Sequence, residues 1–427
     1  MIYWRGILVT FGAYVSVHAG RKAFTNTKAI AMDVLGLDST VAGALDATFM
    51  LAYAVGLVWL GRLGDRVRDP NDILVFSLAS MSVLQVLFAC LLYTNSSTIL
   101  LFIVWILNGM VQSLAWPCCV KLVGVSLSGG ANSSTVFSVW ACNGIVGNIC
   151  CSLLSAFVLD HVDSGRVGLL VVFGITSICN IVAILWLKTC NYPAMHSDGV
   201  HEEDTSESIM SLKTCLGLRG VIDYSMCHAF VKGVAYAMFF WLPFYLVKVH
   251  KVTAGIAAAT TVWYDLATLV GGPLCGLLVQ KTNKPAIVIS VFVLLAAAPQ
   301  FCINEPDEAY FGRYTDHDSI PLLVLFNIVL SGFLVGGVLN VLSAAVCAKI
   351  GGLSHTSMVT GVIDGLGSLG ASATQVAIPM IGVDMDDDWT DVFGLLGCML
   401  IASAVTLFRV TRDEFKPSPI VEYQIQH

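Results

Sequence analysis

Long apolar stretches, each of about 17–25 residues, follow one another along the 427-residue chain with short polar segments between them. Only 12% of the residues are charged, against about 25% in a typical soluble domain, so a water-soluble fold would lack the polar residues to cover this much apolar surface. In lipid the backbone satisfies its own hydrogen bonds, and such stretches form helices. The sequence predicts an all-α membrane protein with twelve transmembrane helices, near residues 4–29, 41–61, 72–93, 98–125, 134–158, 166–188, 220–248, 254–280, 284–303, 320–349, 357–382 and 390–410.

The positions of the basic residues predict the orientation of these helices. Most of the 22 lysines and arginines gather on one side if the N-terminus is cytosolic, whereas the loops of the other side are acidic, as at 384–388. Both termini are therefore predicted to be cytosolic, which requires an even number of helices. We predict four regions: an N-terminal six-helix half (1–189), an acidic cytosolic linker (190–219), a C-terminal six-helix half (220–412) and a cytosolic tail (413–427).

A loop motif relates the two halves. The segment from Gly61 to Arg66, which contains Asp65, follows the second predicted helix. A degenerate copy of it, from Gly276 to Lys281, follows the eighth. The first copy resembles the G-x-x-x-D-R loop of the major facilitator superfamily, whose two parallel six-helix repeats bind substrate between them. We interpret Gly61, Asp65 and Arg66 as a structural loop motif that does not touch substrate.

The first helix carries charges where lipid would exclude them. Tyr14, His18, Arg21, Thr25 and Lys28 are spaced 4, 3, 4 and 3 residues apart, which places them on one helical face. Lys22 lies about 100° away. Buried charges cost at least about 2.5–3.5 kcal/mol and usually face a partner or a watery cavity. This face is predicted to present cations to an anion; the alternative is a helix that ends near Arg21, with its basic residues reaching the headgroups.

The seventh helix adds Lys232, with Tyr236 one turn later. Because helices 1 and 7 begin their respective halves, cations on both would close on one anion from opposite sides. The alternative is an ion pair between Lys232 and Asp265 that holds helices 7 and 8 together.

Three acids also lie within predicted helices: Asp46, which has Tyr53 two turns on, Asp265 and Asp364. Each is a candidate counter-ion, proton carrier or gate, and for Asp46 pairing near a helix end is an equal alternative. The fourth helix has Asn108 and Gln112 on one face, and its Trp116-Pro117 step predicts a kink.

Several of these segments resemble one family, the organophosphate:phosphate antiporters, and within it the eukaryotic sugar-phosphate exchangers. The similar segments are RKAFTNTK at 21–28, LDATFMLAYAVG at 45–56, NGMVQSLAWP at 108–117, FVK at 230–232 with WLPFY at 241–245, and TGVIDGLGSLGA at 360–371. In helix 5 the chain departs from the family, since Trp140 is followed by Ala141 and Cys142, where relatives usually have asparagine and a nearby histidine. Asn143 is the neighbouring candidate for substrate contact.

The resemblance implies exchange of a phosphorylated sugar, similar to glucose 6-phosphate, for inorganic phosphate, with Arg21 and Lys232 at phosphate-binding positions. The candidate substrate-binding residues are Arg21, Lys22, Lys28, Lys232, Tyr14, His18, Tyr236 and Asn143, and the candidate coupling or gating residues are Asp46, Tyr53, Asp265 and Asp364. Animal members of the family imply the endoplasmic reticulum rather than the plasma membrane. We expect a monomer or weak dimer.

Two other functions fit the same sequence. One is a proton-coupled organic anion symporter in which Asp265 or Asp364 carries the proton, and the other is a non-transporting membrane sensor or partner subunit. We predict no enzyme, because the chain shows no catalytic spacing. We also predict no cofactor, metal site or nucleic-acid partner, since the nine histidines have no ligand spacing and no C-x-x-C pair occurs among the 14 cysteines.

Overall fold

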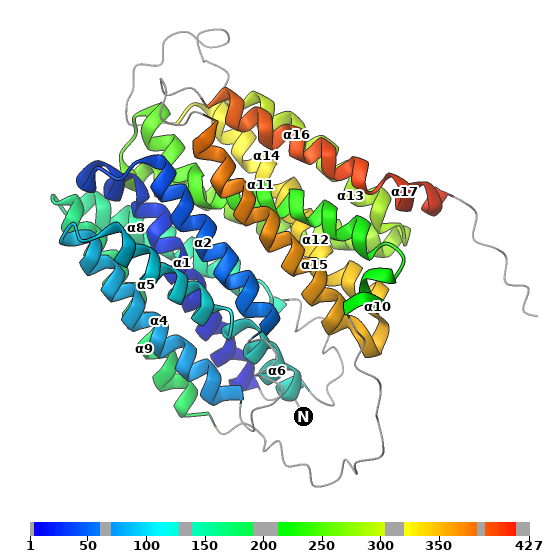
Figure 1. Cartoon of the computed structure of the whole chain (residues 1–427), viewed down its shortest axis with the longest axis horizontal. Coiled ribbons are helices and arrows are strands. Elements are labelled where there is room, and N and C mark those ends of the chain that lie inside the picture. The colour runs from blue at the N-terminus through cyan, green and yellow to red at the C-terminus, as the bar shows by residue number, and fades with distance from the viewer. Residues whose placement is uncertain are drawn as a thin grey trace, which may run out of the picture.

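The computed structural model describes residues 4–59, 70–127, 139–190, 212–303, 320–381 and 389–415. All elements in these ranges are helical. They are α1 (Trp4–Leu35), α2 (Ser39–Trp59), α4 (Pro70–Tyr93), α5 (Thr98–Gln112), α6 (Ala115–Leu127), α8 (Asn143–His161), α9 (Gly165–Lys188), α10 (Leu212–Gly217), α11 (Val221–His250), α12 (Ala254–Thr282), α13 (Pro285–Cys302), α14 (Leu322–Val341), η2 (Leu342–Val346), α15 (Cys347–Met380), α16 (Thr390–Thr406) and α17 (Phe408–Phe415). The long helices lie side by side in one bundle (Figure 1).

Nine helical segments of the described ranges are long and apolar enough to cross a membrane, or ten if α16 and α17, bent by 47°, form one span. Helices α1 and α15 fall outside this count although they have 32 and 34 residues, because both carry many polar residues. With these two included, the helices occupy the positions of the twelve predicted spans. The prediction of an all-α membrane protein is confirmed.

Two predicted boundaries were wrong. We predicted separate helices at 320–349 and 357–382, but the helical backbone continues from Leu322 to Met380 through the π-helical segment η2. No proline occurs between Pro321 and Pro379, so no residue there removes a backbone donor. The first helix, predicted to end at residue 29, continues to Leu35.

The fourth predicted helix is broken, as its Trp116-Pro117 step suggested. Helix α5 ends at Gln112 and α6 begins at Ala115. Proline at 117 has no N–H to donate to the carbonyl of Ser113, four residues earlier, so the α-helical ladder is interrupted at this turn.

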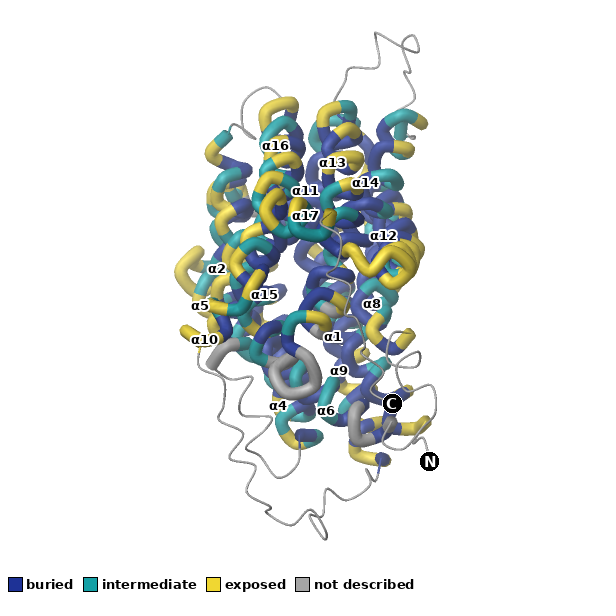
Figure 2. The backbone as a smooth tube through the Cα atoms, turned by 90° about the vertical axis from the view of Figure 1, so that its right-hand side faces the viewer, coloured by how far each residue is buried: buried dark blue, intermediate teal, exposed yellow. Residues whose placement is uncertain are grey.

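Helices α1 to α9 pack mainly on one another, and so do α10 to α17. We call these two groups the first and the second half. Between them, α2 packs against α15, α8 against α12, and α1 against both α11 and α12. Figure 2 shows that the inner faces of the helices are buried, whereas exposed residues lie on the outside.

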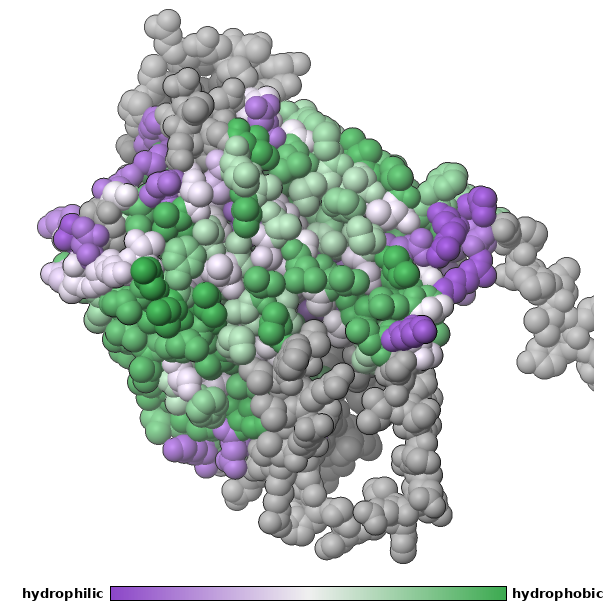
Figure 3. All heavy atoms as spheres, in the orientation of Figure 1, coloured by the Kyte–Doolittle hydropathy of each residue, from purple (hydrophilic) through white to green (hydrophobic). Residues whose placement is uncertain are grey.

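The outer surface fits a lipid environment. Large apolar side chains such as Phe76, Ile99 and Leu322 are exposed on it. In Figure 3 the side of the bundle is mostly hydrophobic and the hydrophilic residues gather towards its ends. None of the 14 cysteines forms a disulfide. The loop-motif residues Gly61, Asp65 and Arg66, most of the predicted linker and most of the tail lie outside the described residues.

Candidate functional site

Arg21 lies in the middle of the bundle and is 1% exposed. Its Nε donates to Oε1 of Gln112 at 3.1 Å, and its Nη1 donates to the Tyr236 hydroxyl at 3.3 Å. The guanidinium lies 4.6 Å from the ring centre of Tyr53. Its Nη2 forms no hydrogen bond with a described residue. These contacts are all neutral, so no carboxylate of the described residues pairs with the buried arginine charge.

Lys232, in α11 of the other half, is buried as well. Its ammonium donates to Oδ1 of Asp364 at 2.7 Å and to the Ser368 hydroxyl at 2.9 Å. His228, one turn earlier, approaches the same carboxylate oxygen with Nε2 at 3.3 Å. The alternative pairing predicted for Lys232 was with Asp265 and is wrong, since α15 rather than α12 supplies the counter-ion. Sequence analysis missed His228, although it lies four residues before Lys232 on one helical face.

Tyr236 connects the two cations. Its hydroxyl accepts from Arg21, and the Lys232 ammonium lies 5.7 Å from its ring centre. One tyrosine therefore lies between the Arg21 guanidinium of the first half and the Lys232 ammonium of the second.

Arg21, Lys22 and Lys28 do not reach headgroups, since each is at most 2% exposed within a helix that continues to Leu35. Lys28 forms an ion pair with Asp46, and both side chains are fully buried. It also donates to the Phe240 carbonyl of α11 at 2.9 Å and lies 4.3 Å from the Trp241 ring centre. In this conformation Lys28 therefore joins the two halves and shares no hydrogen-bond partner with Arg21.

Lys22 uses a carbonyl that a proline leaves without a backbone donor. Pro243 lies inside α11 and cannot donate to the carbonyl of Phe239, four residues earlier. The Lys22 ammonium, from the other half, approaches that carbonyl at 3.4 Å and lies 4.3 Å from the Phe239 ring centre. Pro243 thus explains why Lys22 attaches to α11 at this carbonyl, and Lys28 donates to the next one, that of Phe240.

We expect the Lys28–Asp46 pair to stabilise the protein only while both partners are present. Lys28→Met should destabilise the fold by about 3 kcal/mol, because it leaves a buried carboxylate alone. The double change Lys28→Met with Asp46→Leu should recover most of this loss. Thermal unfolding of the purified proteins in detergent measures both effects, and equal instability of single and double variants would contradict the pairing.

A second polar chain crosses between the halves beside Lys22. His18 Nδ1 lies 3.2 Å from Oδ1 of Asn148 in α8, and Asn148 Nδ2 lies 3.5 Å from Oδ1 of Asp265 in α12. Tyr14 lies one turn before His18, with ring centres 5.0 Å apart. Asn143, also in α8, is fully buried. Asn148 was missed from the sequence, because nothing in its spacing distinguishes it from a packing residue.

The contacts between the halves are concentrated towards one end of the bundle. Among the described residues, four hydrogen bonds join α1 to α11. In α1 they involve only residues from Arg21 onward, and in α11 only residues from Tyr236 onward. The outermost are Lys248 to Asp33 at 2.6 Å and Thr253 to Asp160 at 3.3 Å. We call this the closed end; the other end is where α1 begins and α17 ends.

Close helix approach at the closed end depends on glycine. A Cβ at Gly43 of α2 would lie 2.6 Å from the backbone oxygen of Gln375 in α15 and 2.7 Å from Cγ of Pro379. We expect Gly43→Leu to force these helices apart and to reduce transport at least ~tenfold, since a volume clash against backbone costs about 1–3 kcal/mol. Gly361→Leu in α15 is the control, because a Cβ there meets nothing within 4 Å. Equal transport by both variants in proteoliposomes would contradict the prediction.

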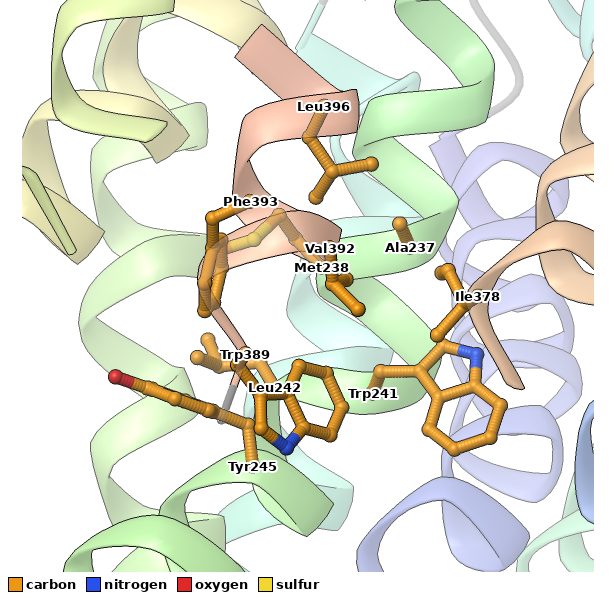
Figure 4. Close-up of a pocket in the computed structure, with 10 residues that line it drawn as sticks. All are labelled: Ala237, Met238, Trp241, Leu242, Tyr245, Ile378, Trp389, Val392, Phe393 and Leu396. Carbon is orange, nitrogen blue, oxygen red and sulfur yellow. The ribbon is translucent and has the colours of Figure 1, made fainter. Parts of the chain in front are cut away.

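An apolar pocket lies between α11, α15 and α16 (Figure 4). Its lining residues are Ala237, Met238, Trp241, Leu242, Tyr245, Ile378, Trp389, Val392, Phe393 and Leu396. It contains no charged side chain, so an anion would find no partner there. The polar cluster around Arg21 and Lys232 is the better candidate site.

An all-helical bundle with a buried polar site between two halves defines a class, the secondary transporters of the membrane. Residues 10–306 match the Major Facilitator Superfamily, and the chain belongs to this family. It is thus a multi-pass membrane transporter and not an enzyme.

Relatives of the chain agree with the resemblance seen in the sequence. The chain is 28% identical to sugar phosphate exchanger 3 of Xenopus laevis, over 95% of this chain and 92% of that protein. It is 28% identical to the mouse glucose-6-phosphate exchanger SLC37A2, over 87% and 79% of the two chains. A putative glycerol-3-phosphate transporter 5 of Arabidopsis thaliana is 26% identical, over 96% and 90%.

Solved structures agree on the fold. The crystal structure of a D-xylose–proton symporter superposes with a TM-score of 0.75, at 14% identity, over 98% of this chain and 100% of that one. A bacterial homologue of the human lysosomal transporter Spinster superposes with a TM-score of 0.70, at 14% identity, over 96% and 95%.

Proposed function

We propose that this protein exchanges a phosphorylated sugar, similar to glucose 6-phosphate, for inorganic phosphate by alternating access. The observation that carries the proposal is the approach of Arg21 and Lys232, from opposite halves, to the same tyrosine. A guanidinium binds phosphate through two parallel hydrogen bonds, and an ammonium adds a compact charge. The names of the relatives support the same substrate class.

The charges of the site favour exchange over one-way transport. Arg21 is buried with neutral partners, so moving the empty site through an occluded state leaves a charge without compensation. Phosphate supplies that compensation. The halves 1–189 and 220–412 then rock about the bound anion. In this scheme Lys22 and Lys28 release the Phe239 and Phe240 carbonyls of α11 when the closed end opens, whereas the Lys28–Asp46 pair lies within the first half and moves with it.

The distribution of contacts between the halves supports a state open towards the end where α1 begins and α17 ends. With the cytosolic termini favoured by the basic residues, this state faces the cytosol. We propose the endoplasmic reticulum as the membrane, on the basis of the resemblance to animal sugar-phosphate exchangers.

Counterflow tests the proposal. Proteoliposomes loaded with inorganic phosphate should take up labelled glucose 6-phosphate, and liposomes without internal phosphate should not. Uptake driven by a pH gradient without internal phosphate would instead favour the proton-coupled symporter. Binding of glucose 6-phosphate without any flux would favour a membrane sensor or partner subunit.

A further inference from the structure

The chain from His18 through Asn148 to Asp265 is not used by the phosphate site described above. It lies between α1, α8 and α12, so it spans both halves. Asp265 is 5% exposed. Its Oδ1 has one long contact, 3.5 Å from Asn148, and its Oδ2 forms no hydrogen bond with a described residue. An ionised carboxylate has about four acceptor sites, so this one has acceptor capacity left for a ligand.

The surrounding residues do not use this capacity. Lys22 forms no ion pair with Asp265, and its ammonium approaches the Phe239 carbonyl at 3.4 Å instead. Neither amide atom of the buried Asn143 has a hydrogen-bond partner among the described residues. The region beside α8 therefore offers a carboxylate acceptor and an amide without assigned partners.

A carboxylate repels phosphate but accepts hydrogen bonds from hydroxyl groups. His18 precedes Arg21 by three residues, or about 4.5 Å along α1. An organic phosphate held by its phosphoryl group at Arg21 would therefore extend its carbon skeleton towards the level of His18, Asn148 and Asp265.

We propose that Asp265, with Asn148 and His18, binds the hydroxyl groups of the organic substrate and so distinguishes a polyhydroxy phosphate from inorganic phosphate. This inference rests on the proposed function and adds a specificity-determining residue to it. Asp265 contributes to binding of the sugar part only, whereas Arg21 and Lys232 bind the phosphoryl group common to both substrates.

The test compares two exchange reactions in proteoliposomes, phosphate against phosphate and glucose 6-phosphate against phosphate. Asp265→Asn and Asp265→Ala should raise the half-saturating concentration of glucose 6-phosphate about tenfold or more, since hydrogen bonds to a charged group are lost. Phosphate homo-exchange should change less than about twofold, well below the tenfold step expected for a lost bond. Asp72→Asn is the control, because this exposed acid in the first turn of α4 lies outside both the polar chain and the contacts between the halves.

Thermal stabilisation by glucose 6-phosphate provides a second readout that does not depend on transport. The wild type should be stabilised and Asp265→Ala should not, with inorganic phosphate stabilising both. If Asp265→Ala does not fold, the isosteric Asp265→Asn carries the test. An equal loss for both substrates would overturn the inference. So would unchanged selectivity combined with loss of pH-driven uptake, which would make Asp265 a proton carrier. Absence of phosphate exchange by the wild type, with the binding difference retained, would overturn only the proposed function.

Discussion

The Arg21→Lys protein should fold and be produced normally but exchange phosphate at least ~tenfold more weakly than the wild type. Lysine keeps the positive charge and loses the planar fork that binds two phosphate oxygens at once. A lost charge-assisted hydrogen bond costs about 1.5–3 kcal/mol, which corresponds to a factor of ten or more in binding. Initial rates of phosphate homo-exchange over a range of concentrations measure the effect.

The structure adds a reason for this sensitivity. Arg21 already uses Nε for Gln112 and Nη1 for Tyr236, while Nη2 forms no bond with a described residue. A lysine has three N–H donors on one nitrogen, so it cannot hold Gln112 and also offer phosphate the two parallel donors of a planar guanidinium. Binding and alignment are therefore lost together.

Arg5→Lys is the matched control for this change. Arg5 is in the same helix, is exposed, and donates to Thr189 within its own half. We expect its exchange rate to stay within about twofold of the wild type, as surface changes usually have effects below 0.5 kcal/mol. Wild-type exchange by a well-produced Arg21→Lys protein would remove the fork from the mechanism.

Much of the fold followed from apolar length and charge placement, because lipid admits few backbone arrangements. Helix ends were predicted less well. Helix α1 continues past residue 29 because nothing in its sequence stops it before Gly36, which adopts a positive φ of 62°. The continuous helix from Leu322 to Met380 was missed because glycine-rich segments of this kind resemble loops.

The buried cations were identifiable from the sequence, but their partners were not. Spacing along one helix predicts which side chains share a face, and it indicated that Arg21 and Lys28 face inward. It cannot give the rotation and depth of a neighbouring helix. We therefore predicted Lys28 as a substrate-binding residue, whereas it contacts Asp46 and the Phe240 carbonyl. Likewise, Lys232 pairs with Asp364 rather than with Asp265.

The two cations beside Tyr236 differ in their charge compensation. Lys232 has Asp364 as its counter-ion, whereas Arg21 has only neutral contacts among the described residues. An arriving phosphate would be drawn first to the uncompensated guanidinium. In the proposed exchange it would then compete with Asp364 for Lys232, and this competition would couple ligand binding to the contact between α11 and α15.

This coupling makes a double-mutant cycle of Lys232 and Asp364 informative. Asp364→Asn should destabilise the protein by about 3 kcal/mol, because it leaves the buried ammonium without its counter-ion. Lys232→Ala should be destabilising for the reciprocal reason and should also abolish phosphate exchange. The double variant should recover most of the stability, since no unpaired buried charge remains at this site. Thermal unfolding in detergent and exchange in proteoliposomes measure the two properties separately.

Transport by the double variant separates the two roles of Lys232. We expect no recovery of exchange, because the phosphate still lacks its cation from the second half. Restored exchange would mean that Lys232 serves only to neutralise Asp364. As a control, Lys232→Ala combined with Asp265→Asn should be additive in stability, since these residues share no hydrogen bond and contact different helices. The prediction would be contradicted if the control pair were coupled and Lys232 and Asp364 were additive. The counter-ion of Lys232 in the membrane would then be Asp265 of α12 rather than Asp364 of α15.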